Sequence, residues 1–222
     1  MRNVYLVTML FENKISSTDM PLFRGCMIKQ SENNLFFHNH NQDRLRYAYP
    51  LIQYKRIGGH AAIVGLNEGG EAIEKLAKQT SFFCRLGTRN VEMQVAEIRS
   101  EEYVVDISAC MRKYEIQRWL PLNADNYKIF QQMERLADRI DMLEHILVGN
   151  ILSFAKGVNI FFDSPVVCQI SQLENRGVFR YKNVELMNFS ATFQTNISLP
   201  ELIGLGKSAS INNGVIFDVK NQ

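Results

Sequence analysis

The chain has 222 residues, which is enough for one large domain or two small ones, each with a modest hydrophobic core. Apolar residues make up 46% of it and charged residues 22%, an ordinary globular composition that excludes global disorder and a coiled coil. The formal net charge of +2 is too small to indicate nucleic-acid binding by itself, so any such argument depends on where the cations cluster.

Cysteine usage and hydropathy favour a protein of the reducing cytoplasm. The cysteines lie far apart and form no Cys-x-x-Cys pair, which argues against a zinc ribbon, a redox motif and a disulfide scaffold. No apolar run reaches about 18 residues, so no membrane-spanning helix is expected. The apolar stretch at 1–11 runs directly into Glu12 and Lys14, which is not the pattern of a signal peptide.

The first half of the chain alternates strand and helix signals. Ser17, Thr18 and Asp19 are N-cap candidates for a first helix, and Gly58-Gly59 marks a hairpin turn. The outline β-α-β-β-α-β is the order of a ferredoxin-like domain. Strands are expected over residues 4–11, 51–55, 62–66, 92–98 and 103–107, and helices over 16–30 and 71–79.

Near residue 105 the pattern restarts, which predicts two domains, 1–104 and 105–222. Asn123 is the expected N-cap of a long amphipathic helix that Gly149 ends or kinks. The predicted fold class is therefore α+β with two compact halves. In the second half, strands are expected over 118–122, 160–162, 166–170, 177–181, 186–193 and 215–219.

Residues that can do chemistry gather at 37–56, which opens with Phe37-His38-Asn39-His40. Half of the chain's four histidines lie here, two residues apart, beside cations and aromatic rings. On an irregular loop, such a pair can act as acid and base on one phosphodiester of RNA, whose 2′-hydroxyl is the nucleophile. Neighbouring imidazoles disfavour double protonation, which keeps one of them neutral as a base. This route needs no metal.

Two other interpretations of His38 and His40 stay open. On a strand, His-x-His points both side chains to one face and would supply two zinc ligands. His60, His145 or Asp43 would then be the third ligand, and spacing singles out none of them. Alternatively, both histidines are ordinary loop residues with local hydrogen bonds.

Cations and tyrosines follow the histidine pair. The cations are expected to follow the phosphates of bound RNA, and the tyrosines to offer faces on which bases stack. The alternation of the tyrosines also fits one face of a strand, in which case they are core residues. The cations are Arg44, Arg46, Lys55 and Arg56, and the tyrosines are Tyr47, Tyr49 and Tyr54.

A glycine-rich segment, Gly204-Leu205-Gly206-Lys207-Ser208, lies near the end of the chain. It is not a P-loop, because Glu201 stands where the first glycine of that motif is required. The backbone amides around Gly204, Gly206 and Ser208 and the ammonium group of Lys207 can still bind phosphates. A simple turn before a final strand would explain the glycines equally well.

Two further groups of cations differ in what they indicate. Arg176, Arg180 and Lys182 flank Gly177 and suit either a hairpin inserted into an RNA groove or plain surface decoration. On the long helix, by contrast, the cations alternate with acidic residues, so that face is expected to be solvated. These helix cations are Lys128, Arg135 and Arg139.

In combination, these motifs resemble the CRISPR-associated repeat-RNA endoribonucleases of the RAMP superfamily, in the subgroup with a Phe-His-Asn-His block. The resemblance covers nearly the whole chain. One departure is residues 210–214, Ser-Ile-Asn-Asn-Gly, which stand in place of the subgroup's usual Arg-Gly-Phe-Gly-like ending. The missing arginine and aromatic residue bear on RNA affinity or repeat choice rather than on the fold. The matching segments are 37–40, 46–55, 65–69, 123–127, 149–153 and 199–208.

The resemblance implies two tandem ferredoxin-like (RAMP/RRM-like) domains and cleavage of CRISPR precursor transcripts within their repeats. It implies no metal or other cofactor, and products with a cyclic phosphate and a 5′-hydroxyl. One of His38 and His40 would be the general base and the other its assistant, while Lys29 and Tyr47 would orient the substrate or stabilise the transition state. The expected partners are the repeat RNA, CRISPR effector proteins and a second copy of the chain. The alternatives are a repeat-RNA-binding subunit that does not cut, and a zinc-dependent hydrolase built on the two histidines.

Overall fold

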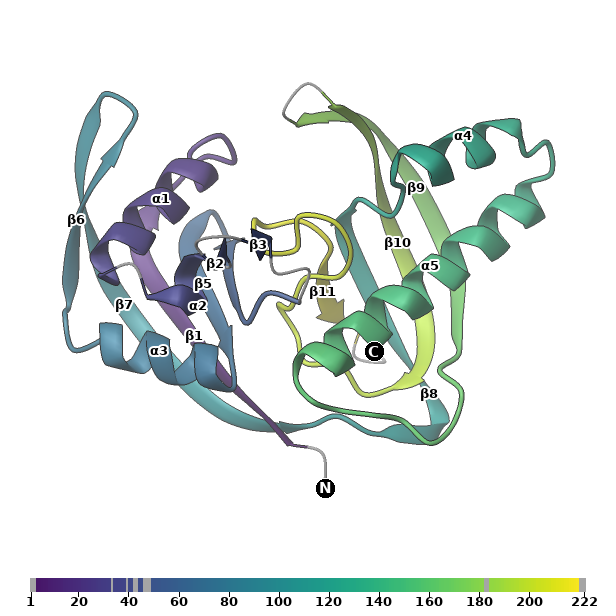
Figure 1. Ribbon diagram of the computed structural model, residues 1–222, viewed down its shortest axis with the longest axis horizontal. Coiled ribbons are helices and arrows are strands. Elements are labelled where there is room, and N and C mark those ends of the chain that lie inside the picture. The colour runs from purple at the N-terminus through teal and green to yellow at the C-terminus, as the bar shows by residue number, and fades with distance from the viewer. Residues whose placement is uncertain are drawn as a thin grey trace. The chain divides into compact units, whose positions relative to one another are not determined.

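The computed structural model describes residues 3–32, 34–38, 40–41, 44–45, 49–181 and 184–219, excepting the side chains of 38, 40–41, 44–45, 179–181 and 184–185 (Figure 1). The chain forms two compact units. The amino-terminal unit consists of Arg2–Val104 with Ser210–Asn212, and the carboxy-terminal unit of Val105–Ala209 with Asn213–Gln222.

The amino-terminal unit is an antiparallel sheet with helices on one face (Figure 1). Its strands lie in the order β4-β5-β1-β7-β6. Without the edge strand β6, this is the topology of a ferredoxin-like domain. The elements are β1 (Asn3–Lys14), α1 (Met20–Gln30), α2 (Leu35–His38), β2 (His40–Asn41), β3 (Arg44–Leu45), β4 (Ile52–Ile57), β5 (His60–Leu66), α3 (Glu68–Leu76), β6 (Ser81–Leu86) and β7 (Arg89–Val104).

The core of this unit lies between the sheet and the helices. Alternate residues of β1 point into it, so that Phe11 is fully buried and meets the rings of Phe23 on α1 and Phe82 on β6. At the start of α3, a Cβ on Gly69 would lie 2.4 Å from the carbonyl oxygen of Leu51, so only glycine allows the helix to approach β4 this closely. The core therefore fixes α1, α3 and β4 against one another.

The carboxy-terminal unit repeats the ferredoxin-like strand order, here β11-β8-β10-β9. Its first crossover is helical, whereas residues 198–214, which include the glycine-rich segment, take the place of the second helix. Helix α5 buries Leu143, Leu147, Ile151 and Phe154, which recur at three- and four-residue steps. The elements are β8 (Ile107–Trp119), α4 (Ala124–Gln132), α5 (Leu136–Gly157), β9 (Cys168–Tyr181), β10 (Val184–Ile197) and β11 (Val215–Asp218).

The predicted class, α+β with two tandem ferredoxin-like domains, is confirmed, while several elements differ from the expectation. Strand β6 was missed, and 103–107 spans the end of β7 and the start of β8. Of the strand expected at 118–122, only the first two residues belong to β8, and 160–162 is not a strand. Gly149 neither ends nor interrupts α5, which continues to Gly157.

The predicted long helix is two helices, because the chain is extended at Met133 and Arg135. Arg139 stabilises the break: its Nε donates to the carbonyl oxygen of Met133 at 2.9 Å, and its guanidinium lies 5.3 Å from the ring centre of Phe130. The expectation that Arg139 belongs to a merely solvated face was therefore wrong.

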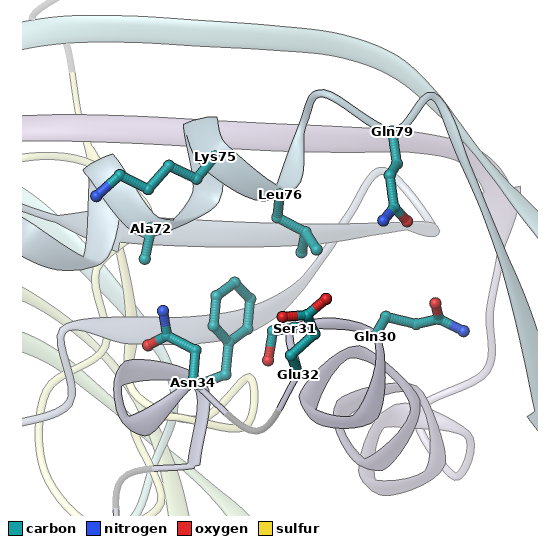
Figure 2. A pocket seen from close by; sticks show the side chains of 9 residues that line it. Gln30, Ser31, Glu32, Asn34, Ala72, Lys75, Leu76 and Gln79 are labelled. Atoms are coloured by element: carbon teal, nitrogen blue, oxygen red, sulfur yellow. The ribbon is translucent and has the colours of Figure 1, made fainter.

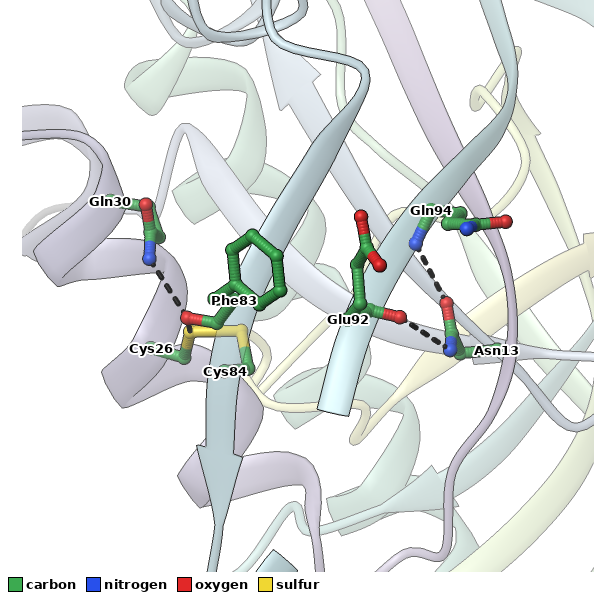
Figure 3. Close-up of a disulfide and its surroundings, with 7 residues drawn as sticks. All are labelled: Asn13, Cys26, Gln30, Phe83, Cys84, Glu92 and Gln94. Atoms are coloured by element: carbon green, nitrogen blue, oxygen red, sulfur yellow. Dashed lines mark hydrogen bonds between the residues drawn. A yellow bond between two sulfur atoms is a disulfide. The ribbon is translucent and has the colours of Figure 1, made fainter. Parts of the chain in front are cut away.

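The structure also contains a disulfide, Cys26–Cys84, which joins α1 to β6 (Figure 3). Beside it, the Gln30 amide donates to the carbonyl oxygen of Phe83 at 2.9 Å. The argument against a disulfide scaffold did not anticipate this single pair, because the two residues are 58 positions apart and only the packing of α1 on β6 brings them together. No helix in the described part of the chain is both long and apolar enough to cross a membrane.

Candidate active site

The two histidines belong to different elements. His38 is the last residue of α2 and His40 the first of β2, which pairs with β3 through His40↔Leu45. Their side chains lie outside the described part of the structure. Assignment of His38 to a helix and of His40 to a strand differs from the single continuous strand that the zinc interpretation requires.

Helix α2 is held to the core by the residue that precedes His38. The Phe37 side chain is 2% exposed, and its carbonyl oxygen accepts a hydrogen bond from the Tyr54 hydroxyl at 3.4 Å. At the other end of α2, the Asn34 side chain accepts from the Phe36 amide at 3.0 Å, in the manner of a helix cap. The core therefore fixes the position of the His38 backbone.

The other possible zinc ligands have local partners. His60 Nδ1 lies 2.9 Å from the carbonyl oxygen of Glu12, and His145 Nδ1 lies 2.7 Å from that of Asp141. Asp43 lies outside the described residues. Among the described residues, no three His, Cys, Asp or Glu side chains come together as a metal site.

Of the two secondary catalytic candidates, Lys29 and Tyr47, the structure describes only Lys29. Lys29 is exposed in the last turn of α1, the helix that packs against α2. Tyr47 falls outside the described residues, as does the cation Arg46. Arg44 pairs with Asn41 in the β2–β3 ladder, and its side chain is likewise not described.

The two cations on β4 differ in their exposure to solvent. Arg56 is exposed, and its Nε donates to the carbonyl oxygen of Ile15 at 2.8 Å. Lys55 is fully buried, and this burial lowers the pKa of its ammonium group to about 7. A buried side chain cannot follow phosphates at the surface, so the expected RNA contact of Lys55 does not fit its position.

The described tyrosines are core residues rather than stacking faces. Tyr54 is fully buried against Phe23, and Tyr49 is 8% exposed, with its hydroxyl accepting from the Gln53 amide at 2.9 Å. Burial raises the pKa of both phenols. Of the two interpretations left open by the sequence, the structure supports the core one for Tyr49 and Tyr54.

Packing explains the first part of the glycine-rich segment. Gly204 pairs with Val215, and Gly206 has a φ of +85°. A Cβ on Gly206 would lie 2.9 Å from Asn150 Oδ1 and 3.1 Å from Trp119 Nε1, the two atoms that share a hydrogen bond of 3.0 Å. The glycines therefore have a structural role, as the turn interpretation holds.

The polar residues of the segment are more accessible. Lys207 is exposed, Ser208 is partly exposed, and the backbone of Ser208 is left-handed, with a φ of +59°. An exposed ammonium group beside such a turn remains suited to a phosphate contact. On the β9–β10 hairpin, Arg176 is paired with Glu174 at 2.8 Å, the Arg180 side chain is not described, and Lys182 lies outside the described residues.

Sequence reasoning missed the role of the residues that follow the glycine-rich segment. Ser210–Asn212 extend the edge of β4: the Tyr54 amide donates to the carbonyl oxygen of Ser210, and the Asn212 amide donates to that of Tyr54, both at 2.9 Å. The Asn212 side chain also accepts from the Arg56 amide at 3.1 Å. We call Ser210–Asn212 the edge segment. Only its departure from the subgroup's usual pattern had drawn attention to it.

Comparison with known proteins gives two family matches along the chain. The family model described as the Cas6b N-terminal domain matches residues 2–104, and the one described as the Cas6b C-terminal domain matches residues 106–219. Among curated proteins, the chain is 29% identical over 126 residues to uncharacterized protein MJ0978 of Methanocaldococcus jannaschii, which covers 56% of this chain and 83% of that protein.

Solved structures share the fold over nearly the full length. A crystal structure of Cas6b has a TM-score of 0.88 at 22% identity and covers 98% of this chain and 100% of its own. A structure described as CRISPR RNA processing endoribonuclease Cas6b has a TM-score of 0.76, again at 22% identity, with the same coverage of 98% and 100%.

Proposed function

Because the chain belongs to the Cas6b family over both of its halves, we propose that it is an endoribonuclease that cuts CRISPR precursor transcripts within their repeats to give crRNAs. The observation that carries this proposal is the family match together with an intact Phe-His-Asn-His block, which lies where α2 ends and β2 begins. The first residue of that block, Phe37, is buried in the core, which supports a fixed position for the start of the block.

The proposed reaction uses the RNA as its own nucleophile. The 2′-hydroxyl attacks the adjacent phosphorus, the P–O2′ bond forms, and the P–O5′ bond breaks. One of His38 and His40 takes the 2′-hydroxyl proton, and the other group assists by protonating or stabilising the departing 5′-oxygen. The products carry a 2′,3′-cyclic phosphate and a 5′-hydroxyl. Proton transfer and the internal nucleophile suffice, so the proposed reaction is metal-independent and uses no other cofactor.

Lys29 and Tyr47 are proposed to orient the phosphate or stabilise its developing charge.

The proposed RNA contacts come from the cations that remain accessible or lie outside the described residues. Phosphate contacts position the RNA, while its sequence must be read at the bases. Lys55 is left out because it is buried. Gly204 and Gly206 are assigned to the packing of their segment instead. The proposed contacts are Arg44, Arg46, Arg56, Arg180, Lys182, Lys207 and Ser208.

The test is cleavage of a synthetic copy of the protein's own genomic repeat in EDTA, beside repeats with a single 2′-deoxy substitution at each candidate position. We expect one cut, abolished by one deoxy substitution. His38→Ala and His40→Ala should each slow the cut by about 10²- to 10⁴-fold while RNA binding is largely kept. His145→Ala is the matched control, because that imidazole is engaged on the exposed side of α5.

Two results would contradict the proposal. A cut that EDTA abolishes and zinc restores would favour the zinc-dependent hydrolase. Salt-sensitive binding of the repeat with no cut at any pH would favour a subunit that binds repeat RNA without cutting.

CRISPR effector proteins and a second copy of the chain are proposed partners, and the cytoplasm is the proposed location. Analytical ultracentrifugation with and without RNA tests the homodimer.

A further inference from the structure

A pocket of about 260 Å³ lies beside the histidine segment, between the end of α1, helix α2 and helix α3. Figure 2 shows Ala72 and Leu76 of α3 on one side of it and Ser31, Glu32 and Asn34 on the other. The lining residues are Gln30, Ser31, Glu32, Asn34, Phe37, Ala72, Lys75, Leu76 and Gln79.

Polar groups make up most of the accessible lining of the pocket, and a small apolar floor lies beneath them. Phe37, Ala72 and Leu76 are 2%, 6% and 8% exposed and form the floor. Glu32 and Gln79 are exposed at the rim, and within the described part of the chain neither side chain makes a hydrogen bond or ion pair. The pocket therefore offers a carboxylate and an amide that have no partner among the described residues, above a small apolar floor.

The position of the pocket relates it to the proposed reaction. Phe37, in its floor, is the neighbour of His38 on the same helix. Gln30, in its wall, follows Lys29 in the last turn of α1. An occupant of the pocket would thus lie next to two segments that carry proposed catalytic residues.

We propose that this pocket binds one unpaired nucleobase of the substrate RNA, close to the cut phosphodiester. The inference rests on the proposed function and adds a base-reading site to it. A pocket smaller than the roughly 300–1,000 Å³ typical of drug-sized ligands suits a single ring system. Sequence-specific RNA recognition uses unpaired bases whose faces lie on apolar side chains and whose edges form hydrogen bonds.

The rim also indicates which bases fit. The Glu32 carboxylate can only accept hydrogen bonds when ionised. The matching edge therefore carries N–H donors, as in bases with an exocyclic amino group. The Gln79 amide can donate or accept, and the ammonium group of Lys75 adds a donor for a base oxygen.

The test combines single abasic substitutions around the cut with variants of the rim. RNA affinity and single-turnover rate are measured for the intact repeat and for each abasic repeat. We expect one abasic position to weaken binding or slow cleavage about tenfold. Glu32→Gln should lower the affinity for the intact repeat, or its cleavage rate, by a similar factor. On the repeat that lacks this base, the same substitution should have little further effect. Gln79→Ala should show the same coupling more weakly.

Matched controls come from exposed residues outside the pocket. Glu71→Gln changes an exposed carboxylate on α3, and Lys78→Ala changes a cation next to Gln79 in sequence; neither residue lines the pocket. Both should behave like the unaltered protein on every RNA. Thermal melting of each variant shows that the fold is kept, as expected for exposed side chains.

The outcomes separate this inference from the proposed function. If the repeat is cut but Glu32→Gln has the same effect on the intact repeat as on every abasic repeat, the pocket does not bind a base. If nothing is cut but one abasic position is coupled to Glu32 in binding, the base pocket stands and the nuclease proposal falls. If no repeat RNA binds at all, both are overturned.

Discussion

Tyr54 connects the hydrophobic core with the histidine segment. Its ring packs against Phe23, its backbone holds the edge segment, and its hydroxyl donates to the Phe37 carbonyl next to His38. A local pattern of alternating apolar residues predicts that such a side chain is buried, but it cannot show which carbonyl its hydroxyl reaches.

Tyr54→Phe should slow single-turnover cleavage severalfold and leave RNA affinity unchanged. The variant keeps the ring but removes the hydrogen bond to the Phe37 carbonyl, which leaves the end of α2 less well fixed and costs about 1 kcal/mol of unfolding free energy. Quenched-flow cleavage and filter binding measure the two quantities. Tyr127→Phe is the control, because that hydroxyl accepts a hydrogen bond from the Gln131 amide within α4, in the carboxy-terminal unit. An unchanged cleavage rate in Tyr54→Phe would contradict a positioning role.

Lys55 should make stability depend on pH in a predictable direction. Burial lowers the pKa of its ammonium group to about 7 in the folded protein, below the ordinary value of 10.5. Between these two values the unfolded chain binds more protons than the folded one, so the unfolding free energy rises with pH, by at most about 1.4 kcal/mol per pH unit. Below pH 7 both states are protonated and this contribution is flat.

Urea denaturation at pH 6, 7, 8 and 9 measures this dependence, with pH values chosen around the pKa of about 7. In Lys55→Met the rise should be smaller than in the unaltered protein, because the group that titrates is gone. Lys78→Met, which changes an exposed lysine, should keep the full rise. Equal slopes in the unaltered protein and Lys55→Met would show that Lys55 stays charged when buried.

At the scale of elements, two glycines in the carboxy-terminal unit should respond oppositely to alanine. At Gly206 the φ of +85° and the contacts of an added Cβ with Asn150 and Trp119 make alanine strained, at a cost of roughly 1–3 kcal/mol. Gly149 lies inside α5, where an added Cβ meets nothing within 4 Å, so alanine should stabilise the helix by about 1 kcal/mol. Thermal melting of Gly206→Ala and Gly149→Ala measures both, and a shift of equal sign in the two variants would contradict the argument.

The disulfide between α1 and β6 should be a large contributor to stability. It closes a loop with a sequence separation of 58 residues, for which the chain-entropy estimate is about 4 kcal/mol. The Cys26→Ser/Cys84→Ser double variant should therefore melt well below the unaltered protein, while Cys110→Ser, at an exposed free cysteine, should not. Reductant should lower the melting temperature of the unaltered protein and of Cys110→Ser, but not that of the double variant.

Alkylation of the denatured chain tests the disulfide directly. Without reductant it should modify only Cys110 and Cys168, and with reductant it should also modify Cys26 and Cys84. Modification of all of them without reductant would show that the thiols stay free, as the sequence had indicated for a reducing compartment.

At the scale of the whole molecule, local periodicity predicted the order of elements but not the features that depend on distant residues. Alternation in the strands and three- and four-residue steps in the helices are local signals, so the ferredoxin-like order of the first half could be predicted from them, whereas that of the second half was implied by the family resemblance. The break between α4 and α5 depends on Arg139 reaching back to Met133, and the disulfide on the packing of α1 against β6.

The candidate site, too, was predictable only where its features depend on local sequence. Residue types and spacing singled out His38 and His40 as catalytic candidates, and the resemblance added Lys29 and Tyr47 as secondary candidates. The local pattern around Lys55 did not show that it is buried. The role of the edge segment could not be predicted because it depends on contacts between distant parts of the chain: Arg56 and Asn212 are 156 residues apart. The edge segment was interpreted as a loss of RNA-binding residues, whereas the structure shows that it extends a sheet.

Asn212 provides the test of this long-range pairing. Its backbone is left-handed, with a φ of +51°, and it is 7% exposed. Asn212→Gly keeps the amide that bonds to Tyr54 and tolerates this φ, so it should lose only the side-chain acceptor for Arg56, about 1 kcal/mol. Asn212→Ala adds backbone strain and should lose about 2 kcal/mol or more. Asn212→Asp keeps an acceptor and should lose least.

Urea denaturation of the full chain ranks the three variants by unfolding free energy. The expected order of loss is alanine, then glycine, then aspartate. Equal losses for Asn212→Ala and Asn212→Gly would show that the left-handed backbone is not required at this position. No loss in any of the three would show that the edge segment does not pair with β4, and β4 would then be the exposed edge of its sheet.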